Sequence, residues 1–362
     1  MFTDQELALY SRHFTLPLVG KAGQLALKNS RVLCIGAGGL GAPILLYLAA
    51  AGVGTLGIID NDVLDLSNLQ RQILYTQADV GQSKAESARH RLKALNPHVD
   101  VIPYVARLTK ENALKIIQNY DIVVDGSDNF ATRYLVNDAC FTLGKPNVYG
   151  SIFQFEGQCS IFWKDHGPCY RCLFPSVPED FAPNCREAGV LGVLPGLLGC
   201  IQANEVIKLI LKIGDSLIGQ LFSVDALSMH VQKFPISINP HCELCQHKKT
   251  FLEMEYHDVE FCALEQETES RISLETFKKL HSEKEKFSLI DVREISDHQA
   301  FNIGGQCIPI ESLDKNMHSL NKEEKIIFYC EVGEISKKAA YLLKNNGFKE
   351  VYSLNGGITA FQ

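Results

Sequence analysis

The stretch RVLCIGAGGLGAPILLYLAAA, residues 31–51, decides the fold of this chain. Its apolar start, Arg31–Ile35, predicts a β-strand, and its apolar second half, Leu40–Ala51, predicts a helix. The sequence GAGGLG lies between them. Glycines at such a position permit a tight turn and let backbone N–H groups approach a phosphate at the positive end of the helix. The glycines that we expect to form this phosphate-binding turn are Gly36, Gly38, Gly39 and Gly41.

The same alternation of strand and helix continues along the first half of the chain. A second strand is predicted at Thr55–Asp60 and a helix at Lys84–Leu95, and further elements follow: strand Val99–Val105, helix Glu111–Gln118 and strand Asp121–Asp125. Alternation of this kind predicts a parallel sheet with helices on both faces, an α/β fold of the Rossmann-like type. Asp60 ends the second strand about twenty residues after the glycines, where a carboxylate can bind ribose hydroxyls.

Length and composition limit the classes of protein that fit. With 362 residues the chain exceeds the usual size of one domain, so two domains are expected. Hydrophobic residues make up 46% and charged residues 21%, as in an ordinary soluble protein. The net charge of −7 argues against general binding of nucleic acid or of an anionic membrane, because both need clustered lysines and arginines.

The beginning of the chain predicts a cytoplasmic protein. Met1 leads into Thr3–Glu6, a capping-box pattern ahead of a polar helix, and not into a secretory signal. In a cytoplasmic protein, twelve cysteines indicate metal binding or catalysis before disulfides. The most apolar stretch, Ala188–Ile201, is interrupted by Pro195 and is followed by polar residues, so we expect a buried or interface helix that is too short to span a bilayer.

Polar and charged residues surround the predicted phosphate turn. They are Arg12, Asn68 and Arg71 within DLSNLQRQ, Lys84, and Asp128 within DGSDN. Two arginines, a lysine and a further aspartate suit adenylyl transfer better than hydride transfer, because the first must relieve repulsion among anions. A nicotinamide-dependent oxidoreductase is the alternative, and binding of NADH without binding of ATP would establish it.

These motifs carry a resemblance to a known family. The segment from Arg12 to about Cys245 resembles the ubiquitin-activating-type adenylyltransferases of the MoeB/ThiF/HesA family through GAGGLG, DNDVLDLSNLQRQ and DGSDN. The resemblance is closest to the Uba4-like and MoeZ-like members, in which a rhodanese domain follows. It implies that ATP is used to adenylylate the C-terminal glycine of a ubiquitin-like sulfur carrier of the MoaD/ThiS type, which ends in Gly-Gly.

The resemblance also implies a role for each residue. Asp60 would bind the ribose; Asn68, Arg71 and Lys84 would bind the phosphates; Asp128 would bind Mg²⁺; and Arg12 would come from the partner subunit of a homodimer. The carrier's C-terminal carboxylate has a reference pKa of roughly 3.5, so it is ionised at neutral pH and needs no general base. Transfer of the carrier to a lysine or a peptide remains a further possibility.

Two Cys-x-x-Cys pairs predict a structural zinc site. They are Cys169 with Cys172 and Cys242 with Cys245. Four thiolates complete a tetrahedral shell and leave no open position, so Zn²⁺ would tie the end of the first domain to its middle. The alternative, a redox dithiol, needs a βαβ context that neither pair shows.

A further cysteine, Cys185, lies in the stretch FAPNCREAGVLG beside Arg186, which favours the thiolate. In related two-domain proteins a cysteine here forms an acyl or disulfide intermediate with the carrier. The alternative is that Cys185 is a loop cysteine without a catalytic role.

The C-terminal part is predicted to be a separate small α/β domain. We place the adenylation domain at residues 1–245, a polar linker at 246–269 and the second domain at 270–362. The elements predicted for the second domain are helix Leu274–Leu280, strand Phe287–Asp291, strand Lys325–Cys330, helix Ser336–Asn345 and strand Glu350–Leu354.

This second domain resembles a single rhodanese domain. LIDVRE, FNIGG, FYC and LNGGI carry the resemblance, which makes Cys330 the candidate persulfide carrier. It would receive sulfur from a donor such as a cysteine desulfurase.

Active rhodanese loops usually carry a basic residue after the cysteine, whereas this loop carries Glu331 and Glu334, whose charges should repel anionic donors. The alternative is a domain that only docks partners. Whether the sulfur is destined for molybdopterin, thiamine or tRNA stays open.

Overall fold

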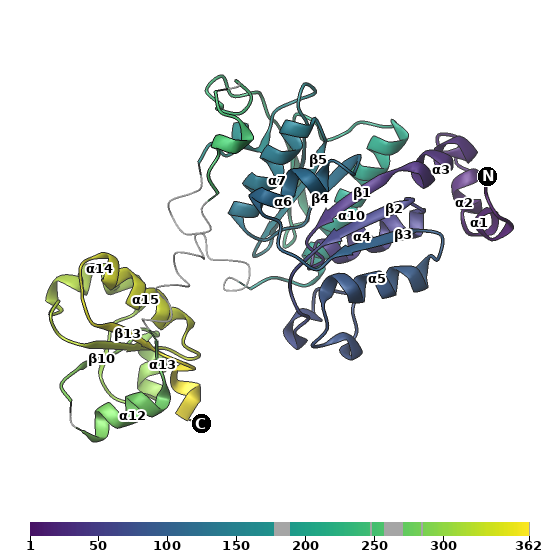
Figure 1. The fold of residues 1–362 in the computed structure, drawn as a ribbon. Coiled ribbons are helices and arrows are strands. Elements are labelled where there is room, and N and C mark those ends of the chain that lie inside the picture. Colours follow the sequence, from purple (N-terminus) through teal and green to yellow (C-terminus); the bar gives the residue numbers. More distant parts are fainter. Residues whose placement is uncertain (177–188, 247, 257–270, 284, 362) are drawn as a thin grey trace. The chain divides into compact units, whose positions relative to one another are not determined.

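The computed structural model describes residues 1–176, 189–246, 248–256, 271–283 and 285–361. The chain divides into two compact units, Met1–Tyr256 and His257–Gln362, which are described here one at a time (Figure 1).

The first unit is built on an eight-stranded sheet with the order β3-β2-β1-β4-β5-β6-β7-β8. The strands are β1 (Arg31–Ile35), β2 (Thr55–Ile59), β3 (Asp100–Tyr104), β4 (Ile122–Asp125), β5 (Asn147–Phe153), β6 (Glu156–Phe162), β7 (Gln220–Asp225) and β8 (His230–Pro235). The first five pair in parallel and the last four in antiparallel fashion, with β5 common to both sets. Ile35 lies beside Ile59 on one side and Asp125 on the other, so β1, β2 and β4 end together. This confirms the predicted α/β Rossmann-like fold.

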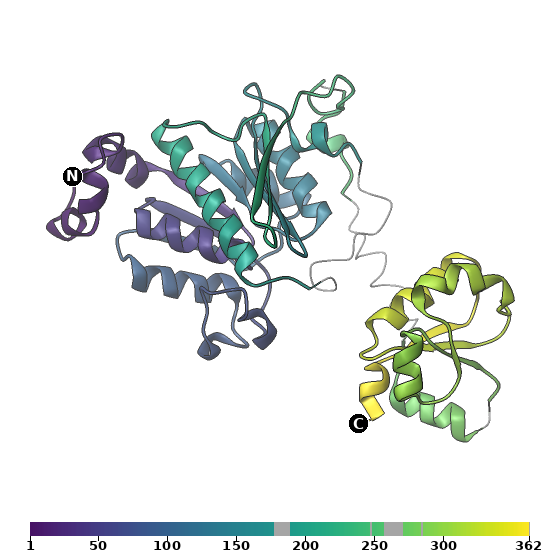
Figure 2. The same cartoon turned by 180° about the vertical axis from the view of Figure 1, so that it is seen from behind.

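Helices cover both faces of this sheet. They are α1 (Asp4–Leu9), α2 (Ser11–Phe14), α3 (Gly20–Asn29), α4 (Gly41–Ala51), α5 (Lys84–Leu95), α6 (Lys110–Ile117), α7 (Phe130–Leu143), α8 (Tyr170–Leu173) and α10 (Val193–Leu211). Residues of α4, α5 and α10 share one buried cluster with the sheet, and residues of α6 and α7 share another, so the two groups pack on opposite faces (Figures 1 and 2). The shorter 3-10 turns of this unit are Leu66–Asn68, Gln77–Asp79 and Phe251–Glu253.

Helix α10 corrects the expectation for the apolar stretch 188–201. The helix runs over 19 residues, from Val193 to Leu211. Pro195 lies in its first turn, where a proline costs no intrahelical hydrogen bond. The polar residues do not end the helix, because Gln202 Nε2 donates to the Asp125 carbonyl at 2.9 Å and Glu205 accepts from the Leu217 N–H at 3.0 Å.

By length and composition alone, α10 is the one helix among the described residues that could cross a membrane. This is weak evidence, because the core helix of a soluble protein passes the same test. Leu194, Leu198, Ala203 and Val206 of α10 are buried in the cluster that α4 and the sheet also form.

The first unit extends beyond the boundary expected at residue 245. Phe251 and Met254 are 3% and 2% exposed, and the Tyr256 hydroxyl donates to Asp138 Oδ2 at 2.9 Å. Residues 251–256 therefore belong to the packed unit although polar residues surround them in the sequence.

The second unit holds a five-stranded parallel sheet with the order β11-β10-β12-β13-β9. Its strands are β9 (Arg271–Ile272), β10 (Ser288–Asp291), β11 (Gln306–Cys307), β12 (Ile326–Tyr329) and β13 (Val351–Leu354), and its helices are α12 (Leu274–Ser282), α13 (Ile295–Ala300), α14 (Leu313–Asn316) and α15 (Glu334–Asn345). Three 3-10 turns complete it: Ile310–Ser312, Met317–Ser319 and Gly357–Phe361. β12 ends directly before Cys330, and α15 begins four residues after that cysteine.

Candidate functional site

The glycine turn lies where β1 ends and α4 begins. Gly36 has a φ of +83°, which favours glycine, and a Cβ at Gly41 would collide with the Gly36 carbonyl oxygen. No side chain caps the start of α4, so its first N–H groups have no side-chain acceptor. The backbone at the positive end of α4 is thereby arranged as an anion-binding turn.

Asp60 fixes this turn from the end of β2. Its carboxylate accepts from the Ala37 N–H and from the Asp62 N–H, each at 2.8 Å. Burial raises the pKa of Asp60, and the nearby Lys84 opposes that effect. A carboxylate has about four acceptor positions, so Asp60 retains capacity for two ribose hydroxyls.

Two cations approach the turn from its open side. Lys84, the first residue of α5, is 5% exposed and forms a 2.7 Å ion pair with Asp62. Arg71 is half-buried and donates to the Ser67 carbonyl at 3.2 Å, and its Cγ lies 3.7 Å from the position of a Cβ at Gly39. The structure therefore brings two of the three predicted phosphate ligands, Arg71 and Lys84, to the ends of the strands that carry the turn.

Asn68 and Asp128 lie at the same ends of the strands, beside the glycine turn. Asn68 ends a 3-10 turn, and its carbonyl accepts from the Arg71 N–H at 3.1 Å. Asp128 is exposed and follows β4, whose next residue Gly126 donates its N–H to the Ile35 carbonyl at 2.9 Å. The turn with Asp128 thus packs against the glycine turn.

Arg12 lies elsewhere in its own chain. It is exposed on α2, and its neighbour Tyr10 accepts a 2.8 Å hydrogen bond from Asn96, the residue after α5. Helix α5 begins at Lys84, beside the glycine turn. Its other end therefore lies at the opposite ends of the strands (Figure 1). Arg12 is therefore the one predicted nucleotide ligand that the described residues do not bring to the site.

Three buried residues of the site were not predicted. The Tyr75 hydroxyl lies 2.9 Å from the Ala37 carbonyl oxygen and 3.1 Å from that of Lys84, so it joins the turn to α5. Gln72 is 4% exposed beneath Gly38. Arg133 donates to the Ser127 carbonyl at 3.3 Å and so supports the turn of Asp128. Gln72 is the last residue of the motif DNDVLDLSNLQRQ, whereas no motif indicated Tyr75 or Arg133.

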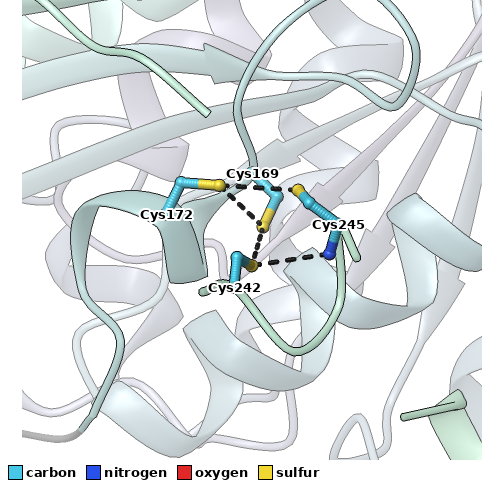
Figure 3. A group of neighbouring side chains, drawn as sticks. All are labelled: Cys169, Cys172, Cys242 and Cys245. Carbon is cyan, nitrogen blue, oxygen red and sulfur yellow. Dashed lines mark hydrogen bonds between the residues drawn. The ribbon is translucent and has the colours of Figure 1, made fainter. Parts of the chain in front are cut away.

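The four predicted zinc ligands form one cluster (Figure 3). The Sγ–Sγ distances are 3.5 Å for Cys169–Cys242, 3.5 Å for Cys172–Cys245 and 3.8 Å for Cys169–Cys172. Zn–S bonds of about 2.3 Å in a tetrahedron place sulfurs about 3.8 Å apart, so the cluster fits Zn²⁺.

An ionic network holds the cysteine cluster against α7. The Arg171 side chain, between the first two cysteines, donates to both oxygens of the buried Asp138 at 2.7–3.1 Å. Tyr256 donates to the same carboxylate. The cluster therefore ties residues 169–172 to the last part of the unit, as the sequence spacing predicted.

In the second unit, Cys330 occupies a cradle of hydrogen-bond donors. Its Sγ accepts from the Gly333 N–H at 3.2 Å, the Ser336 N–H at 3.4 Å and the Ser336 hydroxyl at 3.5 Å. The cradle also lies at the positive end of α15. Such surroundings stabilise a sulfur anion, as expected for a persulfide carrier.

Glu331 does not stand alone beside this cradle. Arg293 Nη1 donates to its carboxylate at 3.0 Å, and Arg293 also forms a bidentate pair with the buried Asp291. Hydrogen bonds to Asp291 raise the pKa of Arg293. Cys185, the other predicted sulfur-transfer residue, lies outside the described residues.

Comparison with known proteins identifies the class. The model of the ThiF family matches residues 10–245, and the model of the rhodanese-like domain matches residues 273–362. The chain belongs to the ThiF family and carries a rhodanese-like domain at its C-terminal end. A solved structure of Escherichia coli MccB shares the fold, with a TM-score of 0.59 at 23% identity over 66% of this chain and 74% of that one.

Several relatives resemble the chain over most of its length. It is 43% identical to the probable adenylyltransferase/sulfurtransferase MoeZ of Mycobacterium tuberculosis, over 99% of this chain and 93% of that protein. It is 38% identical to the adenylyltransferase and sulfurtransferase MOCS3 of Arabidopsis thaliana, over 99% and 84%. A sulfur carrier protein adenylyltransferase of Thermus thermophilus is 50% identical over 73% of this chain and 99% of its own. The chain is thus an enzyme of the adenylyltransferase and sulfurtransferase type. These relatives give no support to the oxidoreductase alternative.

Proposed function

We propose that this enzyme uses ATP to adenylylate the C-terminal glycine of a ubiquitin-like sulfur carrier and then delivers sulfur to form a thiocarboxylate. The proposal depends on one observation. The glycine turn, Asp60, Arg71, Lys84 and Asp128 lie together at the carboxyl ends of the parallel strands. The Thermus relative is named for a sulfur carrier protein, and a relative from Haloferax volcanii, 51% identical over 66% of this chain, is named a SAMP-activating enzyme.

The residues at this edge match the charge changes of adenylyl transfer. The carrier carboxylate is already ionised, so the obstacle is repulsion between it and the α-phosphate. In our proposal Lys84 and Arg71, which lie beside the glycine turn, bind the β- and γ-phosphates and offset the charge that moves onto pyrophosphate. Asp60 would orient the nucleotide through its ribose.

In our proposal the first unit binds two metal ions. Mg²⁺ usually binds one or two carboxylates together with substrate phosphates, and the exposed Asp128 offers such a carboxylate beside the turn. Mg²⁺ would supply charge neutralisation of the phosphates. Zn²⁺ would bind Cys169, Cys172, Cys242 and Cys245 and would act structurally, because the four thiolates fill its shell.

A homodimer would complete the site. Arg12 lies at the ends of its own strands that are opposite to the glycine turn. In our proposal it therefore binds the nucleotide in the site of the partner subunit. Exposed apolar side chains are available for such contact: Leu16 and Leu18 after α2, Tyr47 of α4 and Val193 of α10 are each at least 50% exposed. Burying side chains of this kind is a common source of dimer stability. We place the enzyme in the cytoplasm, where its free thiols would stay reduced.

Sulfur transfer would use the second unit. In the proposed sequence, Cys330 accepts sulfur from a donor such as a cysteine desulfurase and passes it to the activated carrier, with Cys185 as a further carrier of the intermediate. The donor cradle around Cys330 supports the first of these roles.

The deciding experiment is intact-mass analysis of a candidate Gly-Gly carrier after incubation with the enzyme, ATP, Mg²⁺ and a persulfide-loaded cysteine desulfurase. We expect adenylate first and thiocarboxylate after sulfur is supplied. The Asp128→Ala variant should lose ATP–pyrophosphate exchange by about a hundredfold or more, whereas Asp215→Ala, an exposed aspartate after α10, should not change it. Full exchange by Asp128→Ala would contradict the proposal.

A further inference from the structure

Arg12 is exposed, yet the residues on both sides of it are bonded to the core of their own subunit. The Tyr10 hydroxyl accepts a hydrogen bond from Asn96 Nδ2 at 2.8 Å. The His13 ring Nδ1 lies 2.7 Å from Gln24 Oε1. The exposed fractions of Tyr10, Gln24 and Asn96 are 4%, 0% and 1%. Buried side chains therefore hold the backbone before and after Arg12.

Both buried amides also bind the end of helix α4. Asn96 Nδ2 donates to the Ala49 carbonyl at 2.7 Å. Gln24 Nε2 donates to the Ala51 carbonyl at 2.8 Å. These carbonyls belong to the last turn of α4, where a helix leaves carbonyl groups without partners of its own. Because the amide nitrogen of Gln24 faces Ala51, its oxygen faces His13, and the imidazole donates its Nδ1 proton.

Helix α4 joins this cluster to the nucleotide site of the same chain. It begins at Gly41 in the glycine turn and ends at Ala51, which is a length of roughly 16 Å at about 1.5 Å per residue. Gly52 follows with a φ of +81°, and a Cβ there would lie 2.5 Å from Tyr10 Cζ. The tyrosine ring therefore packs directly on the end of the helix that carries the turn.

The alternative is that the two amides only cap α4. Capping requires one partner for each amide, namely the carbonyl of the last helical turn. Each amide here has a second partner, and that partner adjoins Arg12: Tyr10 precedes it by two residues and His13 follows it directly. Capping accounts for the first set of bonds and leaves the second set unexplained.

We infer that Tyr10, His13, Gln24 and Asn96 are positioning residues that fix Arg12 for the nucleotide site of the partner subunit. This inference rests on the proposed function, in which Arg12 acts in the partner's site. A backbone that is already held in place leaves only the torsions of the Arg12 side chain to be ordered when it meets the nucleotide. Preorganisation of this kind lowers the entropic cost of binding.

The test uses mixed dimers of two full-length chains with different affinity tags. One chain carries Arg12→Ala and the other carries Lys84→Ala. The mixed dimer then holds one complete site, made from the nucleotide residues of the first chain and Arg12 of the second.

Tyr10→Phe is added to one chain or to the other. ATP–pyrophosphate exchange with a Gly-Gly carrier should fall about tenfold when Tyr10→Phe accompanies Lys84→Ala, because that chain supplies Arg12. Exchange should stay within about twofold when Tyr10→Phe accompanies Arg12→Ala. Gln24→Met, which can bond neither to His13 nor to the Ala51 carbonyl, should show the same dependence on placement.

Tyr120→Phe is the matched control. It removes another buried hydroxyl of the first unit, which lies 3.0 Å from the Tyr104 hydroxyl on a side chain that is 1% exposed. Exchange should stay within about twofold with Tyr120→Phe in either chain.

The dependence on placement separates positioning from stability, because both mixed dimers contain one Tyr10→Phe chain. An equal loss in both placements, or a loss only beside Arg12→Ala, would refute the positioning role and leave the action of Arg12 in the partner's site intact. A mixed dimer of Arg12→Ala and Lys84→Ala without exchange, under conditions where the wild type is active, would refute that action itself. A wild type without exchange in the presence of the carrier would refute the proposed adenylylation.

Discussion

Single residues at the two sites show what a sequence motif conveys and what it leaves out. The motif around Cys330 suggested that Glu331 opposes sulfur transfer, because a carboxylate follows the cysteine directly. Its partner Arg293 lies 38 positions earlier, and no spacing rule connects the two. Residue types could therefore be predicted at this site, but the pairing of charges could not, because it depends on the neighbouring strands β10 and β12.

At the residue scale, Asp291 should make the second unit sensitive to acid. Burial raises its pKa, but hydrogen bonds from Arg293 and His298 outweigh burial, so the pKa is lowered overall. A lowered pKa contributes stability above the unfolded value of about 3.9, and that stability is lost as the pH falls through the folded value. Asp291→Asn should therefore cost about 3 kcal/mol at pH 7 and progressively less below about pH 4.

Scanning calorimetry of the full-length wild type and variant between pH 7 and pH 3 measures this effect. Glu323→Gln, with its exposed pair, serves as the control that should change the melting temperature little at any pH. A difference between Asp291→Asn and the wild type that stays constant over this range would contradict the assignment.

At the scale of elements, the hydrophobic periodicity of the sequence predicted helices and strands correctly where the pattern was strong. The strands β1, β2, β3 and β4 and the helices α4, α5 and α6 lie within about one residue of their predicted bounds. Helix α10 was misplaced because its polar residues are satisfied by distant backbone groups, such as the Asp125 carbonyl, which the sequence does not reveal. Helix α7 and the antiparallel strands β5–β8 had no prediction. The predicted nucleotide residues converge only because parallel strands end together.

The contact between α10 and α4 offers a test of this element. A Cβ at Gly199 would lie 2.5 Å from Pro43 Cγ and 2.6 Å from the Leu40 carbonyl oxygen, at the start of α4. Gly199→Ala should therefore destabilise the first unit by about 1–3 kcal/mol and raise the KM for ATP, because it displaces the glycine turn. Thermal unfolding and ATP–pyrophosphate exchange measure the two effects.

Gly196, in the same helix, is the matched control for that substitution. Among the described residues, no heavy atom outside the helix's own backbone lies within 4 Å of a Cβ at Gly196, so Gly196→Ala should be neutral or stabilise by up to about 1 kcal/mol. Equal effects of the two substitutions would show that helix propensity, and not the contact with α4, sets the outcome.

At the scale of the whole molecule, two chemistries are assigned to two compact units. The nucleotide site is built from residues of the first unit and the sulfur cradle from residues of the second. Cys330→Ser should therefore leave ATP–pyrophosphate exchange within about twofold of the wild type while abolishing thiocarboxylate formation from a desulfurase. Intact-mass analysis of the carrier separates the two steps. Retained thiocarboxylate in Cys330→Ser would show that sulfur reaches the carrier by another route.

The cysteine cluster should contribute strongly to the stability of the first unit. Cys242→Ser should remove bound zinc, as measured by plasma emission spectrometry, and lower the melting temperature of this unit by about 10 °C, corresponding to roughly 4 kcal/mol. Cys200→Ser alters a half-buried thiol outside the cluster and should retain the metal. A chain that binds no zinc when purified with zinc present would contradict the zinc assignment.

The end of the first unit also has a consequence for biosynthesis. Cys242, Cys245, Phe251, Met254 and Tyr256 all come from its last fifteen residues, and they pack against partners near Asp138 and Cys169. A ribosome therefore delivers the closing contacts last, after every strand of the sheet has emerged. Domains fold as units during translation, so the nascent first unit stays incomplete until residue 256 has left the ribosome. A pause in translation after that point would give this unit time to close before the sulfur-carrying unit follows.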